Sequence, residues 1–164
     1  MHVQLCEAAS GSFDILPPVR TLAIDLGTRR IGLALSDEGA RFATPHEVLN
    51  VRSPDHAIEA IVSVVTREGV QRLVVGLPLN MDGTIGPQAR ATVAWANQLA
   101  SRAKIPFLFV DERLSSFDAE QQLIDRKRGG ERLTRKRKKA QLDALAAASF
   151  LQAFLDGKLK PLEI

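Results

Sequence analysis

The sequence predicts an α/β fold with a five-stranded mixed sheet and helices on both of its faces. Three apolar segments follow one another early in the chain with only short turns between them, which is typical of antiparallel neighbours. Further along, strand-like and helical periodicities alternate, as parallel strands with helical crossovers require. A length of 164 residues and a hydrophobic content of 45 % suit one domain with an ordinary core.

Three strands are predicted in the early part of the chain. Residues 21–26 form a short apolar run, typical of a central strand covered on both faces, and Asp25 interrupts it near its end. Residues 27–30 indicate a turn, and residues 31–36 alternate large with small side chains as an antiparallel partner does. A third strand is predicted at about residues 44–51.

The rest of the chain alternates helices with strands. Apolar positions three and four residues apart indicate the helices, with Pro near two of the expected starts and Gly69 as a stop. We predict helices over residues 54–68, 87–103, 115–125 and 139–156, and strands over residues 71–77 and 107–111. A three-stranded meander followed by this alternation is the order of a ribonuclease H-like fold.

The composition favours a cytoplasmic protein. The lone Cys6 cannot form an internal disulfide, and nothing indicates an oxidising compartment. Residues 1–19 lack a basic leader and a long apolar run, so we interpret them as a flexible N-terminal extension before a single domain over residues 20–164. No stretch reaches the roughly 18 apolar residues of a membrane span, so no membrane contact is expected.

Positive charge is concentrated in one segment, residues 126–139. It holds nine Lys or Arg and one Glu, a local charge of +8, which leaves −5 on the rest of a chain whose net charge is +3. Such a basic loop on an acidic body indicates a surface that meets a polyanion, most simply nucleic acid. The alternative is a solvated loop without a partner. The cations we assign to nucleic-acid binding are Arg126, Lys127, Arg128, Arg135, Lys136, Arg137 and Lys138.

Three carboxylates far apart in the sequence are the candidates for catalysis and metal binding: Asp25, Glu112 and Asp143. Asp25 lies in a strand expected to be buried, where an ionised carboxylate is costly unless something compensates it. Asp143 lies on an otherwise apolar helical stripe, and Glu112 lies at the end of the fifth strand, where ligands of α/β sheets commonly bind. Such hard oxygen ligands suit Mg²⁺ or Mn²⁺, and a pair of these ions can activate water for phosphodiester hydrolysis.

Each carboxylate also has a structural alternative. Asp25 can cap the bend at Gly27, Glu112 can pair with Arg113 or another neighbouring base, and Asp143 can lie in the first turn of its helix, where the macrodipole favours an acid. Their joint occurrence favours one shared explanation over three separate ones. The pattern leaves open whether Glu112 or the acid just before it faces the metal.

Four motifs follow one another along the chain: IDLGTRRIGLA at residues 24–34, VGLPLNMDG at 75–83, VDERLSS at 110–116 and DALAA at 143–147. Together they resemble the YqgF family of pre-16S ribosomal RNA nucleases, also described as Holliday-junction-resolvase-like. The likeness runs in order from about residue 22 to residue 155, so it covers all but the two ends of the chain.

This resemblance implies a ribonuclease H-like fold and a divalent-metal-dependent nuclease, with Asp25, Glu112 and Asp143 at the positions of the family's acidic residues. It also implies action on structured RNA, in the 5′-end maturation of pre-16S rRNA. The alternatives are a resolvase of four-way DNA junctions, which needs a homodimer to cut two strands symmetrically, and a nucleic-acid-binding module without activity. Monomer and homodimer both stay open.

The opening motif has a competing interpretation. Asp-x-Gly-Thr at residues 25–28 also resembles the phosphate-binding hairpin of the actin, sugar-kinase and chaperone ATPase superfamily. Those proteins enclose ATP between two such domains, and 164 residues supply only one. The length therefore argues against an ATPase.

Two further polar residues are candidates for nucleic-acid contacts. Arg113 offers paired donors to a phosphate, although an ion pair with Asp111 is an alternative role. Asn80, near the start of the second helix, can present a donor to a nucleic-acid backbone.

Overall fold

The computed structural model describes residues 16–113 and 135–164, apart from the side chains of residues 135–140. The elements in these ranges are β1 (Thr21–Leu26), β2 (Arg30–Ser36), β3 (Ala43–Asn50), α1 (Pro54–Glu68), β4 (Arg72–Leu77), α2 (Pro87–Ala103), β5 (Phe107–Asp111) and α4 (Arg135–Leu155). The bounds of the five strands and of α1 and α2 agree with the sequence prediction to within one residue.

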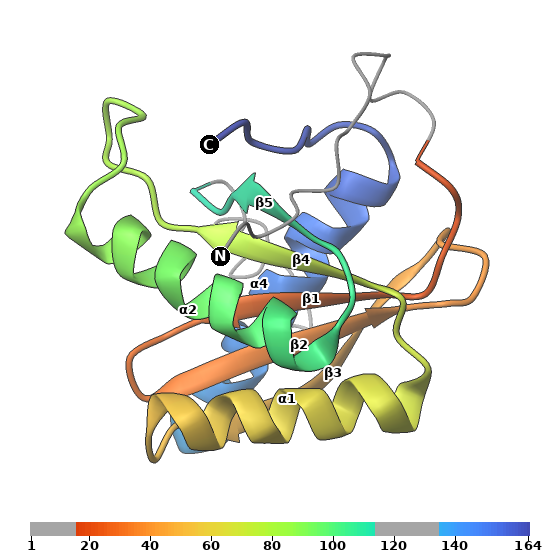
Figure 1. Cartoon of the computed structure of the whole chain (residues 1–164), viewed down its shortest axis with the longest axis horizontal. Coiled ribbons are helices and arrows are strands. Elements are labelled where there is room, and N and C mark those ends of the chain that lie inside the picture. Colours follow the sequence, from red (N-terminus) through yellow and green to blue (C-terminus); the bar gives the residue numbers. More distant parts are fainter. Residues whose placement is uncertain (1–15, 114–134) are drawn as a thin grey trace.

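The strands form one mixed sheet in the order β3-β2-β1-β4-β5. β1 pairs antiparallel with β2, and β2 with β3, whereas β4 lies parallel to both β1 and β5. In Figure 1, α1 and α2 cover one face of the sheet and α4 covers the other. The predicted fold class is confirmed.

Local sequence signals explain where the first two helices begin and end. The Ser53 side chain accepts a hydrogen bond from the backbone N–H of His56, and Pro54 follows in the first turn of α1. That helix ends at Gly69 in the left-handed conformation (φ 64°), which glycine adopts without steric cost. α2 likewise begins with a proline, Pro87.

The two faces of the sheet carry side chains of different size. Large aliphatic side chains such as Leu22, Ile24 and Leu33 point toward α1 and α2 and form the main core. The opposite side, called the α4 face, is built from Ala23, Ala34, Val74 and Val110, which pack against Ala147, Ala148, Phe150 and Leu151 of α4. Small side chains let α4 lie close to the strands.

The α4 helix lies very close to the sheet at Gly32 of β2. A Cβ atom at this position would overlap the backbone carbonyl of Asp143 and crowd the N–H of Ala144. Gly32 is also the register partner of Asp25 on β1. The absence of a side chain at one position therefore brings two of the candidate acids together from opposite ends of the chain.

The last helix is longer than predicted. α4 begins at Arg135 instead of about residue 139, so residues 135–138, which we expected in the basic loop, are helical. Lys, Arg, Gln and Ala are strong helix formers, and in this segment their intrinsic propensity outweighs the unfavourable placement of cations at a helix start.

Other sequence predictions lie outside the described residues. These are the helix over 115–125, the basic segment over 126–134 and the first fifteen residues of the expected flexible extension. Residues 16–19 are described, and the carbonyl of Pro17 accepts a hydrogen bond from Arg72 of β4 at 3.0 Å. Among the described helices, none combines the length and apolar character needed to cross a membrane.

We predict that Gly32→Ala lowers the free energy of unfolding by roughly 2 kcal/mol or more, because α4 must move off β2 to admit the methyl group. Chemical denaturation measures this loss. The matched control is Gly39→Ala, where the added Cβ meets only the ends of the Asp37 and Arg41 side chains. Equal stability of the two variants would contradict the close packing of α4 on β2.

Candidate active site

Asp25 lies near the end of β1 on the α4 face of the sheet. Its chain neighbours Ile24 and Leu26 contribute to the main core, so the alternation of strand side chains turns Asp25 to the opposite side. The residue is half-buried. A carboxylate in this setting loses part of its hydration, and the fold gains no evident stabilisation in exchange.

Glu112 follows directly after β5 and reaches Asp25 across β4. A Cβ at Gly76 of β4 would lie 2.8 Å from Glu112 Oε2 and 3.0 Å from the ring of Phe150, so the missing side chain leaves the space that the Glu112 carboxyl fills. The carboxyls of Glu112 and Asp25 are hydrogen-bonded to each other. Glycines thus flank Asp25 on both sides, Gly32 toward Asp143 and Gly76 toward Glu112.

Asp143 comes from α4, well past the first turn that begins at Arg135. Its charge acts on Asp25 and raises the pKa of that carboxyl, which places the two acids within electrostatic reach. Its Oδ2 accepts a hydrogen bond from Arg30 Nε at 2.6 Å, in an ion pair that joins residues 113 positions apart. Both side chains of this pair are about a quarter exposed.

Arg30 is a residue that the sequence reasoning missed. It lies in the opening motif two positions before Gly32, so strand alternation places both residues on the α4 face. The sequence pattern places Arg30 in the predicted turn over residues 27–30, one residue before the predicted strand, so alternation along the strand was not applied to it. Nothing in the sequence, however, indicated which acid it would meet.

Burial and mutual repulsion change the proton affinity of the two central acids. Desolvation, with the nearby charge of Asp143, raises the pKa of Asp25 to about 6, although the hydrogen bond from Glu112 opposes the rise. Desolvation, repulsion from Asp25 and the hydrogen bond to it raise the pKa of Glu112 to about 8. Near neutral pH, without a cation, Glu112 therefore keeps a proton and donates it to Asp25.

The particular contacts named above as structural alternatives do not form among the described residues. The N–H of Gly27 is bonded to the Arg30 carbonyl, so that bend does not need Asp25 as a cap. Arg113 pairs with Asp111, not with Glu112. Asp143 lies outside the first turn of its helix, so the macrodipole does not account for it.

Arg113 and Asn80 lie together beside the end of β5. The Arg113 guanidinium donates to both oxygens of Asp111, at 3.0 and 2.9 Å from Nε, and to the carbonyls of Asn80 and Met81. This guanidinium lowers the pKa of Asp111. The Asn80 side chain donates to Thr84 within the same loop, at 2.8 Å. Both residues thus organise the loop between β4 and α2.

The donor set fits a hard divalent cation, although it is not fully assembled. Within residues 16–113 and 135–164, no three His, Cys, Asp or Glu side chains form a ready-made metal cluster. Asp25 and Glu112 are in contact, whereas the third acid, Asp143, is held by Arg30. Three oxygen-bearing side chains with excess negative charge are the ligands that Mg²⁺ and Mn²⁺ prefer.

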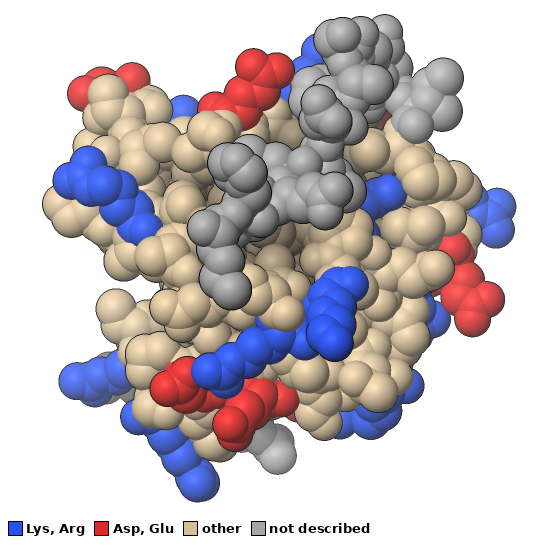
Figure 2. Space-filling view, viewed as in Figure 1, with Lys and Arg blue, Asp and Glu red and all other residues tan. Residues whose placement is uncertain are grey.

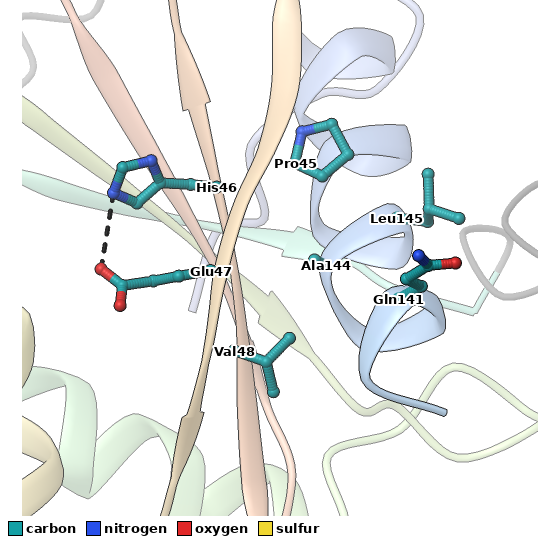
Figure 3. A pocket seen from close by; sticks show the side chains of 7 residues that line it. All are labelled: Pro45, His46, Glu47, Val48, Gln141, Ala144 and Leu145. Atoms are coloured by element: carbon teal, nitrogen blue, oxygen red, sulfur yellow. Dashed lines mark ion pairs between the residues drawn. The ribbon is translucent and has the colours of Figure 1, made fainter. Parts of the chain in front are cut away.

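A separate cavity of about 270 Å³ lies between β3 and α4. On the helix side it is lined near the point where the described side chains of α4 begin. Figure 3 shows Pro45 and Val48 on the strand side and Ala144, Leu145 and Gln141 on the helix. His46 and Glu47 point away from α4 and are paired with each other at 3.5 Å. None of the three candidate acids lines this cavity.

The opposite side of the molecule shows no concentration of positive charge in its described part. Figure 2 views the molecule from the side of α1 and α2, where blue and red side chains are interspersed. Arg67, for example, bonds to both Glu47 and Glu68, and Arg102 to Asp55. Cations with acidic partners of this kind offer little net attraction to a polyanion.

The fold and the carboxylates on its α4 face define the class: a nuclease with a ribonuclease H-like fold. Residues 19–157 match the family model of RuvX, described as Holliday junction resolvase. The chain belongs to the RuvX family, which confirms the resemblance to YqgF, and it is a nuclease.

Relatives in sequence cover most of the chain. The chain is 46 % identical over 137 residues to "Putative pre-16S rRNA nuclease" of Chloroflexus aurantiacus, which covers 84 % of this chain and 86 % of the relative. It is 39 % identical over 142 residues to the protein of the same name from Rhizobium meliloti strain 1021, covering 86 % and 83 %.

Solved structures show the same fold at low sequence identity. RuvC of T. thermophilus in complex with a Holliday junction substrate superposes with a TM-score of 0.56 at 17 % identity, covering 88 % of this chain and 99 % of RuvC. The Mn-soaked human cytomegalovirus terminase nuclease domain gives a TM-score of 0.51 at 14 % identity, covering 92 % and 96 %. These similarities establish the fold alone.

We predict that the free energy of unfolding of the metal-free protein falls as the pH rises from about 4 to about 8. Both pKa values are raised, so the folded state holds protons that the unfolded state has already lost across this window. Glu112→Gln removes most of the fall and makes the protein more stable than the wild type above pH 8, by about 1–2 kcal/mol. Chemical denaturation across this pH range measures both curves.

The matched control is Asp111→Asn. Because Arg113 lowers the pKa of Asp111, that variant should be less stable than the wild type at neutral pH. A Glu112→Gln protein that loses stability at pH 8 would mean that Glu112 is ionised and well paired there, contrary to the protonated state inferred above.

Proposed function

We propose that this nuclease is a divalent-metal-dependent endonuclease that hydrolyses phosphodiester bonds of structured RNA, in the 5′-end maturation of pre-16S rRNA. One observation carries the proposal: Asp25, Glu112 and Asp143 approach one another on the α4 face. The names of the sequence relatives support the RNA substrate. We place the activity in the cytoplasm, in a monomer or homodimer.

The site suits hydrolysis because its acids carry excess negative charge and because Asp25 and Glu112 share a proton that can dissociate. Water attacks phosphorus and gives up a proton, the bond from phosphorus to the leaving oxygen breaks, and that oxygen takes up a proton. Asp25, Glu112 and Asp143 would hold Mg²⁺ or Mn²⁺, which would supply Lewis-acid activation of the water and charge stabilisation for the leaving oxygen. Asp25 and Glu112 would then give up the proton that they share, because both carboxylates would be needed as ligands.

Four-way DNA junctions are the second candidate substrate, to be compared directly with pre-16S RNA. The family description and the RuvC complex with a Holliday junction substrate favour it. Cleavage of two strands symmetrically requires two active sites related by a two-fold axis, so this activity needs a homodimer. Cleavage assays with pre-16S RNA and junction DNA, beside light scattering on the same sample, separate the two substrates.

We assign the binding of nucleic acid to the basic segment. Residues 126–139 carry the local charge of +8, and their last part continues into α4, the helix that carries Asp143. We also include Arg113 and Asn80 in this interface as residues that hold the loop between β4 and α2 in place. Arg113 already bonds to Asp111, so its direct contact with a phosphate requires an exchange of partners.

We predict that Asp25→Asn lowers the cleavage rate at saturating Mn²⁺ by roughly a thousandfold, because one charged ligand is lost. Binding of the uncleaved substrate, measured by fluorescence anisotropy without metal, should change by less than about twofold. Asp55→Asn, which alters an exposed acid on α1, is the control and should leave both quantities unchanged. Wild-type cleavage by the Asp25 variant would contradict the proposed site.

Replacing Arg135, Lys136, Arg137 and Lys138 together with Ala should weaken binding and flatten its salt dependence. Each lost phosphate contact lowers the slope of log K against log salt concentration by roughly one. Titrations at several salt concentrations measure the slope, with Arg67→Ala on the opposite side as the control. An unaltered slope would exclude these four residues from the interface.

A further inference from the structure

Arg30 and Asp143 form the ion pair that the metal site must disturb. Arg30 Nε lies 2.6 Å from Asp143 Oδ2, and the pair bridges the first residue of β2 and the middle of α4. The same carboxylate acts electrostatically on Asp25. Arg30 therefore neutralises the third acid in the state that the structure describes, while the other two share a proton.

Asp143 is paired in this way in a structure whose described residues form no three-acid metal cluster. A carboxylate oxygen held at 2.6 Å by a guanidinium has a fixed direction and a partner of charge +1. A divalent cation at the same carboxylate competes with that partner, both for the oxygen and through charge repulsion. We therefore expect metal binding at this site to weaken the contact between Arg30 and Asp143.

The guanidinium has further donors for a second anion. Of the guanidinium nitrogens of Arg30, only Nε is hydrogen-bonded to a described residue, and the side chain is about a quarter exposed on the α4 face. The two terminal amino groups are suited to the paired oxygens of a phosphate. A phosphodiester bound beside Asp143 would be next to the guanidinium that already contacts this acid.

We propose that Arg30 holds Asp143 in the metal-free protein and exchanges it for the scissile phosphate when the divalent cation binds. The inference rests on the proposed function, since it uses the same three acids. Arg30 then has two roles. It contacts the substrate phosphate, and it occupies Asp143, the third acid of the metal site, until the cation binds. A nucleic acid without a cation then meets an Arg30 that is already occupied.

The proposal predicts opposite effects of one substitution on metal and substrate. In Arg30→Gln, Asp143 loses its competitor, so Mn²⁺ should bind about fivefold tighter in calorimetric titrations without nucleic acid. At saturating Mn²⁺, the same variant should show a KM for RNA or junction DNA raised about tenfold. Arg29→Gln is the matched control, because it removes the same charge from the exposed neighbouring position and leaves the ion pair intact.

Arg30→Lys keeps the charge but not the paired donors. It should bind Mn²⁺ within about twofold of the wild type and still show a raised KM. This variant carries the test if Arg30→Gln does not fold. An unchanged KM in Arg30→Lys would overturn the contact with phosphate.

Other outcomes separate this inference from the proposed function. Weaker Mn²⁺ binding in Arg30→Gln would mean that Arg30 only supports Asp143, and the exchange would be wrong while the nuclease site stands. Equal effects of Arg29→Gln and Arg30→Gln on Mn²⁺ affinity would mean that only the positive charge of Arg30 matters, and not its ion pair with Asp143. That result would overturn the exchange as well. A wild-type protein that binds no Mn²⁺, or binds it equally well as Asp25→Asn, would contradict the proposed function itself.

Discussion

The contact between α4 and β2 at Gly32 is the constraint on which the site depends. The carbonyl of Asp143 occupies the space that a side chain at position 32 would fill, and Asp25 is the register partner of that glycine. Gly76 does the same for Glu112 on the other side of Asp25. The alanines of the α4 face extend this close packing over the neighbouring strands. Packing of small residues thus brings together acids from the start, middle and end of the chain.

Bringing these acids together opposes stability, and the fold compensates the cost locally. Desolvation and repulsion leave a proton on Glu112, which it donates to Asp25, and Arg30 neutralises Asp143. Both compensations are reversible, since a proton dissociates and a guanidinium can change its partner. A divalent cation can replace them, which links the electrostatic strain of the metal-free site to the hydrolytic function. The surrounding core contributes the stability that makes such a site tolerable.

Local patterns in the sequence were sufficient for most of the fold. Proline starts and a glycine stop predicted α1 and α2, and apolar runs predicted the strands, because these signals act over a few residues. The motifs singled out the three acids. The face of the sheet on which Glu112 lies could not be predicted from the sequence, because neighbouring acids alternate between faces. The structure was needed to decide it. The pairing of Arg30 with Asp143 also escaped prediction, since residues 113 positions apart are joined only by tertiary packing.

A crystal structure of the protein with Mn²⁺, located by its anomalous scattering, tests the proposed metal site most directly. We expect Mn²⁺ between Asp25, Glu112 and Asp143, at the oxygen distances of about 2.0–2.6 Å found for hard divalent cations. We also expect Arg30 Nε to have moved away from Asp143 Oδ2. Manganese bound elsewhere would contradict the assignment of the active site. Manganese bound to the three acids while Arg30 stays on the same oxygen would contradict the coupling of the ion pair to metal binding.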